Sequence, residues 1–339
     1  MSMTLMRREA GEAASAISSM LAEERANIEE AGRLLAGVRG PVTTAARGSS
    51  DHAVTAFKYA CEITTGHPVA SIGPSVASVY DAPLKLDGGL HLTVSQSGAS
   101  PDIIALQHSA TRGGARTIAI VNNAVSPLAK GADLVIPVHA GEERSVAATK
   151  SYLASCAALF AIVAHAVQDE GLLAGLAALP DALDELSDEV DERLVEELAG
   201  SGSLYVTGRG PAFGVALEAA LKAKETAGIH AEAFSVAELM HGPLQLVRPG
   251  FPVVAFVADD AAARGTLEAV AHLRRLGSSV TVITTLDVPG AIVTPSTGHA
   301  ATDALVFALG WYRLVEATTL RKGLDPDRPT NLKKVTQTL

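Results

Sequence analysis

Short apolar runs alternate with longer segments of helical periodicity from about residue 41 onward. Runs of about five apolar or β-branched residues, bounded by glycine, proline or polar turns, are typical of buried strands. In the first half of the chain such runs cover 42–46, 68–72, 90–94, 117–121 and 134–138. Segments of helical pattern separate them, at 52–64, up to Thr111, and at 153–167. Strands that alternate with helices predict parallel βαβ units.

The second half of the chain repeats the order of the first. Strand-like runs at 204–207, 253–257 and 280–283 are again separated by helical segments, at 212–227 and up to Leu276. Arg47-Gly48 has a counterpart in Arg209-Gly210, and Thr117-Ile118-Ala119-Ile120 in Val280-Thr281-Val282-Ile283, in both cases roughly 160 residues later. We therefore expect an α/β fold built from two copies of one unit, each a mainly parallel sheet flanked by helices.

The remaining segments surround the two copies. Residues 1–36 are helical in pattern and mixed in charge, and they lack the apolar core of a signal peptide. Residues 171–202 form an acidic helical stretch whose charged side chains we expect to face solvent. The predicted organisation is a helical segment at 1–36, a first domain at 37–170, a linker at 171–202, a second domain at 203–324 and a C-terminal tail at 325–339.

Composition narrows the class of protein. The 339 residues suffice for two domains of ordinary size, and 48% of them are hydrophobic but only 4% aromatic. A formal net charge of −10 argues against a nucleic-acid binder. The apolar stretch 153–167 is too short to span a bilayer, so it predicts a buried helix and no membrane partner. Cys61 and Cys156 have no metal-binding or redox spacing, which indicates reduced thiols in a cytoplasmic protein.

One polar loop carries the strongest chemical signal. The segment Ser95-Gln96-Ser97-Gly98-Ala99-Ser100 directly follows the alternating run 90–94, which reads as a buried strand. Ser100 suits a helix N-cap and Pro101 the first helical position. Hydroxyls and free backbone N–H groups at a helix N-terminus favour an anion such as phosphate. From composition alone, an ordinary Ser/Gly connection remains the alternative.

Several further stretches match one known family. They are Arg47-Gly48-Ser49-Ser50, Ser95-Gln96-Ser97-Gly98, Ala148-Thr149-Lys150, 218–225, 229–234, 238–244 and the tail 327–336. Together with the duplicated pattern, they resemble tandem sugar isomerase (SIS) domains, above all the isomerase half of glucosamine-6-phosphate synthase. The resemblance covers nearly the whole chain and implies a flavodoxin-like three-layer sandwich for each copy. Its specific motifs are Glu238-Leu239-Met240-His241-Gly242-Pro243 and the tail.

The resemblance implies chemistry on a phosphorylated amino sugar. The synthase has an N-terminal glutaminase domain with a cysteine nucleophile, and neither Cys61 nor Cys156 lies near the start of this sequence. We therefore expect deamination of glucosamine 6-phosphate to fructose 6-phosphate and ammonia, with no metal or redox cofactor. A galactosamine-6-phosphate deaminase/isomerase or a fructosamine-phosphate deglycase is the nearest alternative. A non-catalytic sugar-phosphate sensor is the alternative from another class.

Site residues follow from the resemblance position by position. The sugar phosphate would contact Ser50, Ser95, Gln96, Ser97, Ser100 and the backbone of Val146. Glu225 would move a proton between C1 and C2 of the open-chain sugar, as a single carboxylate can. Lys222, three residues earlier, would steady charge on the substrate oxygen. From the residues alone, Glu225 and Lys222 also fit an ordinary ion pair on a helix surface.

Two further residues complete the implied site. His241 would open the sugar ring, because imidazole titrates near neutrality, and it would reach the site of a neighbouring subunit in a homodimer. Lys334 would form an imine or a hydrogen bond with the open-chain sugar, and Lys333 is the adjacent alternative. A structural loop histidine and a solvated basic tail are the competing interpretations. The sequence departs from the family at Ala148, where the synthase has a serine, and in a tail one residue shorter before Val335-Thr336.

Overall fold

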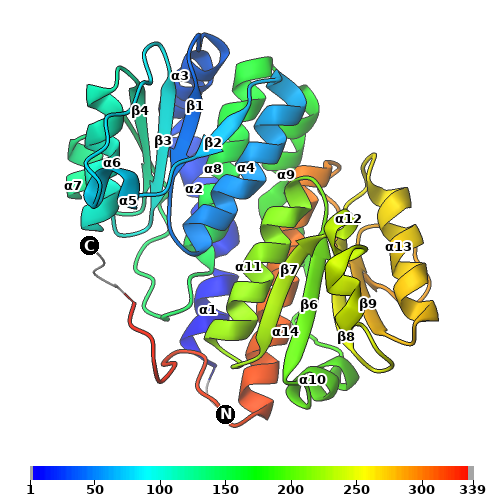
Figure 1. The fold of residues 1–339 in the computed structure, drawn as a ribbon. Coiled ribbons are helices and arrows are strands. Elements are labelled where there is room, and N and C mark those ends of the chain that lie inside the picture. The colour runs from blue at the N-terminus through cyan, green and yellow to red at the C-terminus, as the bar shows by residue number, and fades with distance from the viewer. Residues whose placement is uncertain (1–2, 335–339) are drawn as a thin grey trace. The chain divides into compact units, whose positions relative to one another are not determined.

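The computed structural model describes residues 3–334, which form two compact units, each built on one five-stranded sheet (Figure 1). The first-sheet unit comprises residues 12–143 and 150–177, and the second-sheet unit comprises residues up to Gly11, 144–149 and 178–334. Within the described residues, all paired strands run parallel. The predicted α/β fold with two parallel-sheet copies is therefore confirmed.

The first-sheet unit has the strand order β2-β1-β3-β4-β5. Its strands are β1 Val42–Ala45, β2 Val69–Ser71, β3 Leu90–Ser95, β4 Arg116–Val121 and β5 Leu134–Pro137. Its helices are α2 Ala13–Glu23, α3 Arg25–Ala36, α4 Ser49–Thr65, α5 Ser75–Ser78, α6 Pro101–Arg112, α7 Pro127–Lys130 and α8 Lys150–Val167. Helices α2, α3 and α4 pack on α8 on one side of the sheet, and α5, α6 and α7 lie on the other (Figure 1). Each sheet face is thereby covered, as a parallel sheet requires.

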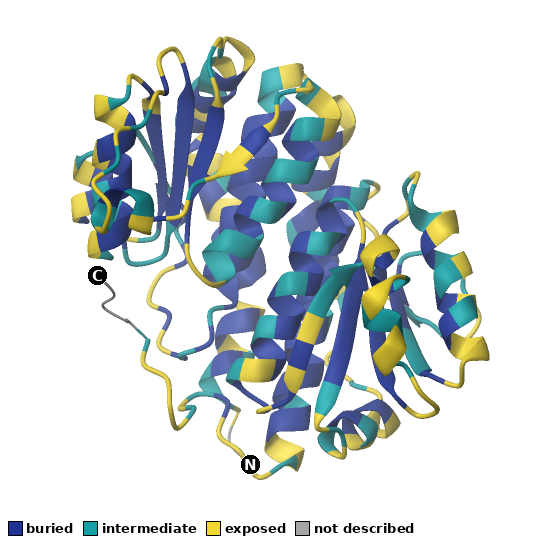
Figure 2. Cartoon of the chain, in the orientation of Figure 1, coloured by how far each residue is buried: buried dark blue, intermediate teal, exposed yellow. Residues whose placement is uncertain are grey.

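Helix α8 is the core helix of the first-sheet unit. Every residue from Lys150 to Ala164 is buried, and the helix is dark blue along most of its length in Figure 2. Among the described residues it alone has the length and hydropathy of a membrane span, but 83% of that window is buried inside the protein. The prediction of a buried helix at 153–167 is thus confirmed for 153–164, where α2, α3 and α4 cover the apolar surface, whereas Val167 at the end of the helix is exposed.

The second-sheet unit repeats the architecture, with the order β7-β6-β8-β9-β10. Its strands are β6 Ser203–Gly208, β7 His230–Ser235, β8 Pro252–Val257, β9 Ser279–Thr284 and β10 Ile292–Val293. Its helices are α1 Leu5–Gly11, α10 Glu192–Ala199, α11 Pro211–Glu225, α12 Val236–Leu239, the 3-10 helix η1 Gly242–Leu246, α13 Ala263–Arg275 and α14 Ala300–Arg321. Helices α1, α10 and α11 contact α14, whereas α12 and α13 pack on the opposite face through the cluster around Tyr205 and Phe251. Helix α9 (Glu170–Glu185) joins the residue ranges of the two units.

The duplication extends to backbone detail. Gly48 precedes α4 with φ of 55°, and Gly210 precedes α11 with φ of 59°. Both values lie in the left-handed region, which favours glycine because other residues are strained there. The Arg-Gly pairs recognised in the sequence therefore make the same strand-to-helix turn in both copies.

Two elements of the second copy do not follow the predicted pattern. Strand β7 lies at the edge of its sheet, and its exposed His230 and Glu232 break the apolar run that marks a buried strand. Helix α14 is buried on nearly all sides, so it has no polar face from which a helical period could be read. Both elements are formed by packing against their neighbours rather than by a local signal.

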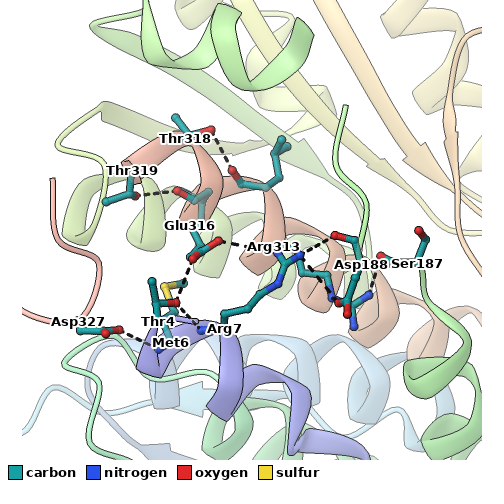
Figure 3. A network of polar contacts seen from close by, with 12 residues as sticks. Thr4, Met6, Arg7, Ser187, Asp188, Arg313, Glu316, Thr318, Thr319 and Asp327 are labelled. Carbon is teal, nitrogen blue, oxygen red and sulfur yellow. Dashed lines mark hydrogen bonds and ion pairs between the residues drawn. The ribbon is translucent and has the colours of Figure 1, made fainter. Parts of the chain in front are cut away.

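The acidic side chains of the linker face solvent, as predicted, and some of them also bind α14. Arg313 and Arg321 on α14 bind its carboxylates: Arg313 Nε is 3.1 Å from Asp188 Oδ1, and Arg321 Nη2 is 2.6 Å from Glu192 Oε2. Arg321 also pairs with Glu196. Arg313 donates to the backbone oxygen of Ser187, as Figure 3 shows. The C-terminal part of the linker is therefore fastened to α14, which the charge pattern alone did not indicate.

A buried histidine should make the first-sheet unit sensitive to acid. His91 on β3 is fully buried, and its Nδ1 lies 2.9 Å from Thr43 Oγ1 on β1. Burial lowers the pKa of His91 to about 4, so the unfolded chain binds more protons than the folded one between about pH 4 and 6.5. The free energy of unfolding should therefore fall as the pH falls through this window, by up to about 3 kcal/mol from this residue.

This expectation is tested by urea unfolding of the wild type and of His91→Gln at pH 7 and near pH 4.5. The variant should lose about 2 kcal/mol less than the wild type between the two pH values, because glutamine does not titrate. All other titratable groups are the same in both proteins, so the difference between the two pH dependences isolates the contribution of His91. An identical pH dependence would contradict the assignment.

Candidate functional site

The predicted phosphate loop lies at the topological switch point of the first sheet, which is the place between β1 and β3 where the strand order reverses. Strand β1 has β2 on one side and β3 on the other, so the connections that leave β1 and β3 pass to opposite faces of the sheet. Open parallel sheets bind ligands in the crevice formed there, beyond the carboxyl ends of the strands. The two loops concerned are 46–48, which enters α4, and 96–100, which enters α6.

The loop 95–100 is tightly folded. Gly98 has φ of 60°, and a Cβ at this position would come within 2.2 Å of Ser126 Oγ, so only glycine fits. Ser95 Oγ accepts a hydrogen bond from the Gly98 N–H at 3.1 Å, and the Leu128 N–H donates to the Gly98 oxygen at 3.1 Å. The side chains predicted to hold the phosphate remain partly accessible at Ser50, Ser95, Gln96, Ser97 and Ser100.

An ion pair with a buried carboxylate joins the two loops at the switch point. Arg47 Nε donates to Asp102 Oδ2 at 3.0 Å, and Arg47 Nη2 also bonds to that oxygen. Asp102 is fully buried, whereas about half of the Arg47 side chain (53%) is exposed. Ser100 occupies the N-cap position of α6, as predicted, but without a side-chain capping bond; Asp102 Oδ1 instead accepts from the Ile103 N–H.

Sequence reasoning missed this pair. The motif match included Arg47, but neither residue was assigned a role, and the signal was an arginine in the Gly-Ser turn with an acid in the first turn of α6. The loop has no lysine, so the exposed part of the Arg47 guanidinium supplies positive charge beside it.

A second group of site residues lies on α11. Lys222 is fully buried, with Nζ 2.8 Å from Glu225 Oε2 and 3.1 Å from Glu218 Oε1. Glu218 is equally buried and accepts a hydrogen bond from the Tyr312 hydroxyl at 3.1 Å. Burial alone would lower the pKa of Lys222, but the charges of Glu218 and Glu225 together outweigh it and raise that pKa. Lys222 is therefore not part of an ordinary ion pair on a helix surface, which was the alternative interpretation of the sequence.

Glu225 is the member of this group that faces open space. About a quarter of its side chain (23%) is exposed, and it lines a pocket of about 660 Å³. The rest of the wall comes from the end of α11, Gly228 and the C-terminal segment, namely Leu221, Lys224, Thr226, 323–325 and 328–332. Lys222 is not in this wall but lies behind Glu225. The arrangement presents a carboxylate, held by a buried ammonium group, to a molecule in the pocket.

The predicted tail lysine lies beside another predicted site residue. Lys334 Nζ donates to the Ser145 oxygen at 2.7 Å, and the Val146 N–H donates to the Asp327 oxygen at 3.4 Å. Lys333 is exposed, so the structure favours Lys334 as the lysine anchored at this segment. The Val335-Thr336 pair used to align the tail lies outside the described residues.

His241 is not near Glu225 within one chain. It follows the carboxyl end of β7, whereas Glu225 ends α11 just before the amino end of β7. The six residues of β7 span about 17 Å at the usual strand rise. The His241 side chain is exposed, and in the part of the chain that the structure describes its imidazole makes no hydrogen bond.

The predicted residues thus fall into two groups. Ser50, Ser95, Gln96, Ser97 and Ser100 belong to the first-sheet unit; Val146, Lys222, Glu225, His241 and Lys334 belong to the second-sheet unit. The corresponding loop of the second sheet carries Asp259 and Asp260 in place of serines. No His, Cys, Asp or Glu cluster within residues 3–334 is arranged to hold a metal ion, and Cys61 and Cys156 are buried free thiols.

Comparisons with known proteins identify the family and the fold. A model of the SIS domain matches residues 39–165 and 197–291. The glutamine–fructose-6-phosphate aminotransferase (isomerizing) of Symbiobacterium thermophilum is 34% identical over an alignment that covers 91% of this chain and 53% of that protein. The chain spans about half the length of the curated relatives it matches.

Two solved structures extend the comparison. A candidate phosphosugar isomerase from Silicibacter pomeroyi DSS-3 is 42% identical, with a TM-score of 0.88 over 96% of this chain and 100% of that one. A glucosamine-6-phosphate deaminase from Thermotoga maritima is 21% identical and shares the fold, with a TM-score of 0.81 over 99% and 100% of the two chains.

Proposed function

The chain belongs to the SIS domain family, and from this premise we propose that it is an enzyme that converts glucosamine 6-phosphate into fructose 6-phosphate and ammonia. The observation that carries the proposal is the Glu218–Lys222–Glu225 group, which holds a carboxylate at the wall of a pocket. An isomerisation needs such a base, because hydrogen must move between adjacent carbons. A sugar-phosphate sensor needs no base, so this group supports catalysis over the sensor alternative.

The phosphate is assigned to the loop 95–100. Its support is the position at the switch point of the first sheet, the partly accessible hydroxyls, and the guanidinium of Arg47 beside them. The positive end of the α6 helix dipole would also favour the anion, although Pro101 has no N–H and the Ile103 N–H already donates to Asp102. Ser50, in the first turn of α4, is assigned to the adjacent part of the sugar.

The proposed chemistry balances without a cofactor. His241 opens the ring by proton transfer, which gives an open-chain aldehyde with an amine on C2. Glu225 removes the proton from C2 and returns it to C1, so that C1 becomes a CH₂OH group and C2 an imine. Water then adds to the imine carbon, ammonia leaves, and the ketone of fructose 6-phosphate remains. We assign Lys222 to holding Glu225, since it is buried, and Lys334 to a contact with the open-chain sugar.

We also propose a homodimer, located in the cytoplasm. His241 is exposed and separated from Glu225 by the length of β7, so the two residues would meet only if His241 serves the site of a second copy. Mixing inactive Glu225→Gln and His241→Ala chains should then restore part of the activity. No recovery in mixed dimers would refute the shared site. The buried free thiols are compatible with a reducing compartment.

The function is tested by ammonia release from purified protein. Glucosamine 6-phosphate and galactosamine 6-phosphate are supplied in parallel, with fructose 6-phosphate alone as the control. Ammonia and fructose 6-phosphate from the first sugar are the expected products. If only galactosamine 6-phosphate released ammonia, the substrate would be that epimer instead. If neither sugar released ammonia, the deaminase assignment would be refuted.

The assigned phosphate loop is tested by Gly98→Ala. The added Cβ would meet Ser126 Oγ at 2.2 Å, so the loop must move, and we expect sugar-phosphate affinity to fall roughly 10-fold or more. Gly66→Ala is the matched control, because Gly66 also has a positive φ, 73°, but open space around the new Cβ. Titration calorimetry with fructose 6-phosphate compares the two variants. Equal affinity in both would exclude the loop as the phosphate site.

A further inference from the structure

A buried carboxylate holds the segment that contains Val146. Glu9 on α1 is only 2% exposed, and its two oxygens accept hydrogen bonds from the N–H groups of Arg144, at 2.6 Å, and Ser145, at 3.0 Å. Charge-assisted bonds of this kind to two successive amides fix both the position and the tilt of the backbone. The segment is thereby fastened to a helix about 135 residues earlier in the sequence.

The C-terminal tail is fastened to the same helix. The Asp327 carboxylate accepts from the N–H groups of Leu5, at 2.7 Å, and Met6, at 2.8 Å, both in the first turn of α1, where N–H groups have no partner within the helix. Figure 3 shows Asp327 beside Met6. An aspartate at this end of a helix is also favoured by the helix dipole. Helix α1 therefore binds the tail at its N-terminal end and the Val146 segment through Glu9.

The tail and the segment also bind each other. The peptide group between Ser145 and Val146 accepts from Lys334 Nζ through its oxygen, at 2.7 Å, and donates to the Asp327 oxygen through its N–H, at 3.4 Å. Helix α1, the segment 144–146 and the tail thus form a closed ring of polar contacts. All three parts belong to the second-sheet unit.

We propose that Glu9 is a positioning residue of the active site, which sets the Val146 backbone and, through it, Lys334. This inference rests on the proposed function, in which these two groups contact the sugar. Glu9 itself does not touch the substrate in this scheme; it acts by holding the peptide group that Lys334 and Asp327 bind. Loss of its charge should loosen the ring at the 144–146 segment and, through that peptide group, in the tail.

The test combines backbone hydrogen exchange with kinetics on Glu9→Gln and Glu9→Ala. Arg8→Ala is the matched control, since Arg8 lies on the same helix but is exposed. For the Glu9 variants we expect exchange at 144–146 and 325–334 to rise roughly 10-fold, with little change in the sheets. Turnover should fall about 10-fold, while fructose 6-phosphate affinity stays within about 2-fold, because the phosphate loop belongs to the other unit.

The outcomes separate this inference from the proposed function. Exchange that stays at wild-type rates in the tail would overturn the inference even in an active deaminase. Faster exchange in the tail with undiminished turnover would overturn it as well. If the wild type converts a sugar phosphate other than glucosamine 6-phosphate, the proposed substrate is wrong. Faster exchange confined to the 144–146 segment and the tail, together with reduced turnover of that other sugar, would still support the positioning role of Glu9. A rise in exchange throughout the second-sheet unit would indicate general destabilisation and would also count against positioning.

Discussion

Glu225→Gln should lower turnover of glucosamine 6-phosphate by about 10²–10⁴-fold, the usual contribution of a general base. The glutamine side chain has the same size, and its oxygen can still accept from Lys222, so the pocket wall should keep its shape. What it cannot do is carry a proton from C2 to C1. We therefore expect exchange of the C2 hydrogen with solvent to disappear while fructose 6-phosphate still binds.

Proton NMR in deuterated water measures the C2 exchange, and calorimetry measures binding. Glu232→Gln is the matched control, because Glu232 is an exposed glutamate on β7 in the same unit and does not line the pocket. It should retain wild-type exchange. Turnover by Glu225→Gln comparable with that control would remove Glu225 from its proposed role.

Lys222→Met should lower the free energy of unfolding by about 3–5 kcal/mol, the range for removing one partner of a buried ion pair. Methionine fills much of the volume, so the loss arises mainly from charge. Glu218 would remain fully buried without the ammonium that lies 3.1 Å away, and the Tyr312 hydroxyl would not replace a full positive charge. Glu225 is affected less, because it can turn toward water.

Urea unfolding with linear extrapolation gives the difference in stability. Lys224→Met, on the exposed side of the same helix, is the control and should change stability by less than about 1 kcal/mol. Adding Glu218→Gln to Lys222→Met removes the buried negative charge that the ammonium of Lys222 had balanced, and should recover most of the loss. If Lys222→Met and Lys224→Met were equally stable, the charges would not be coupled as the distances indicate.

The fold was predictable wherever the burial of an element produces a recognisable pattern of apolar and polar residues within that element. Strands β3 and β4 are buried along nearly their whole length, and their positions followed from the alternating apolar residues at 90–94 and the apolar and β-branched run at 117–121. The edge strand β7 and the buried helix α14 did not, because the first alternates with exposed charge and the second lacks a polar face. In both cases the packing partner is distant in sequence.

The candidate site shows the same limit. The loop 95–100 could be recognised because a strand end, a glycine and a helix start adjoin one another. Burial of Lys222 could not be read from α11, since the residue that covers Glu218, Tyr312, lies 94 positions later. The Arg47–Asp102 pair depends on two connections meeting at one sheet edge, which follows only from the strand order.

Helix α1 has a consequence for how the chain is made. Its N-terminal amides bind Asp327, and Leu5 and Asp327 are 322 positions apart. At roughly 5–20 residues per second, a ribosome adds Asp327 about 16–64 s after Leu5. All described residues of the first-sheet unit have been synthesised once Ala177 has emerged, so this unit can fold before Asp327, the partner of α1, has been made. During that interval Met6 and Ala10, buried in the finished protein, are exposed on the nascent chain, and the speed of translation sets how long a chaperone or protease has access to them.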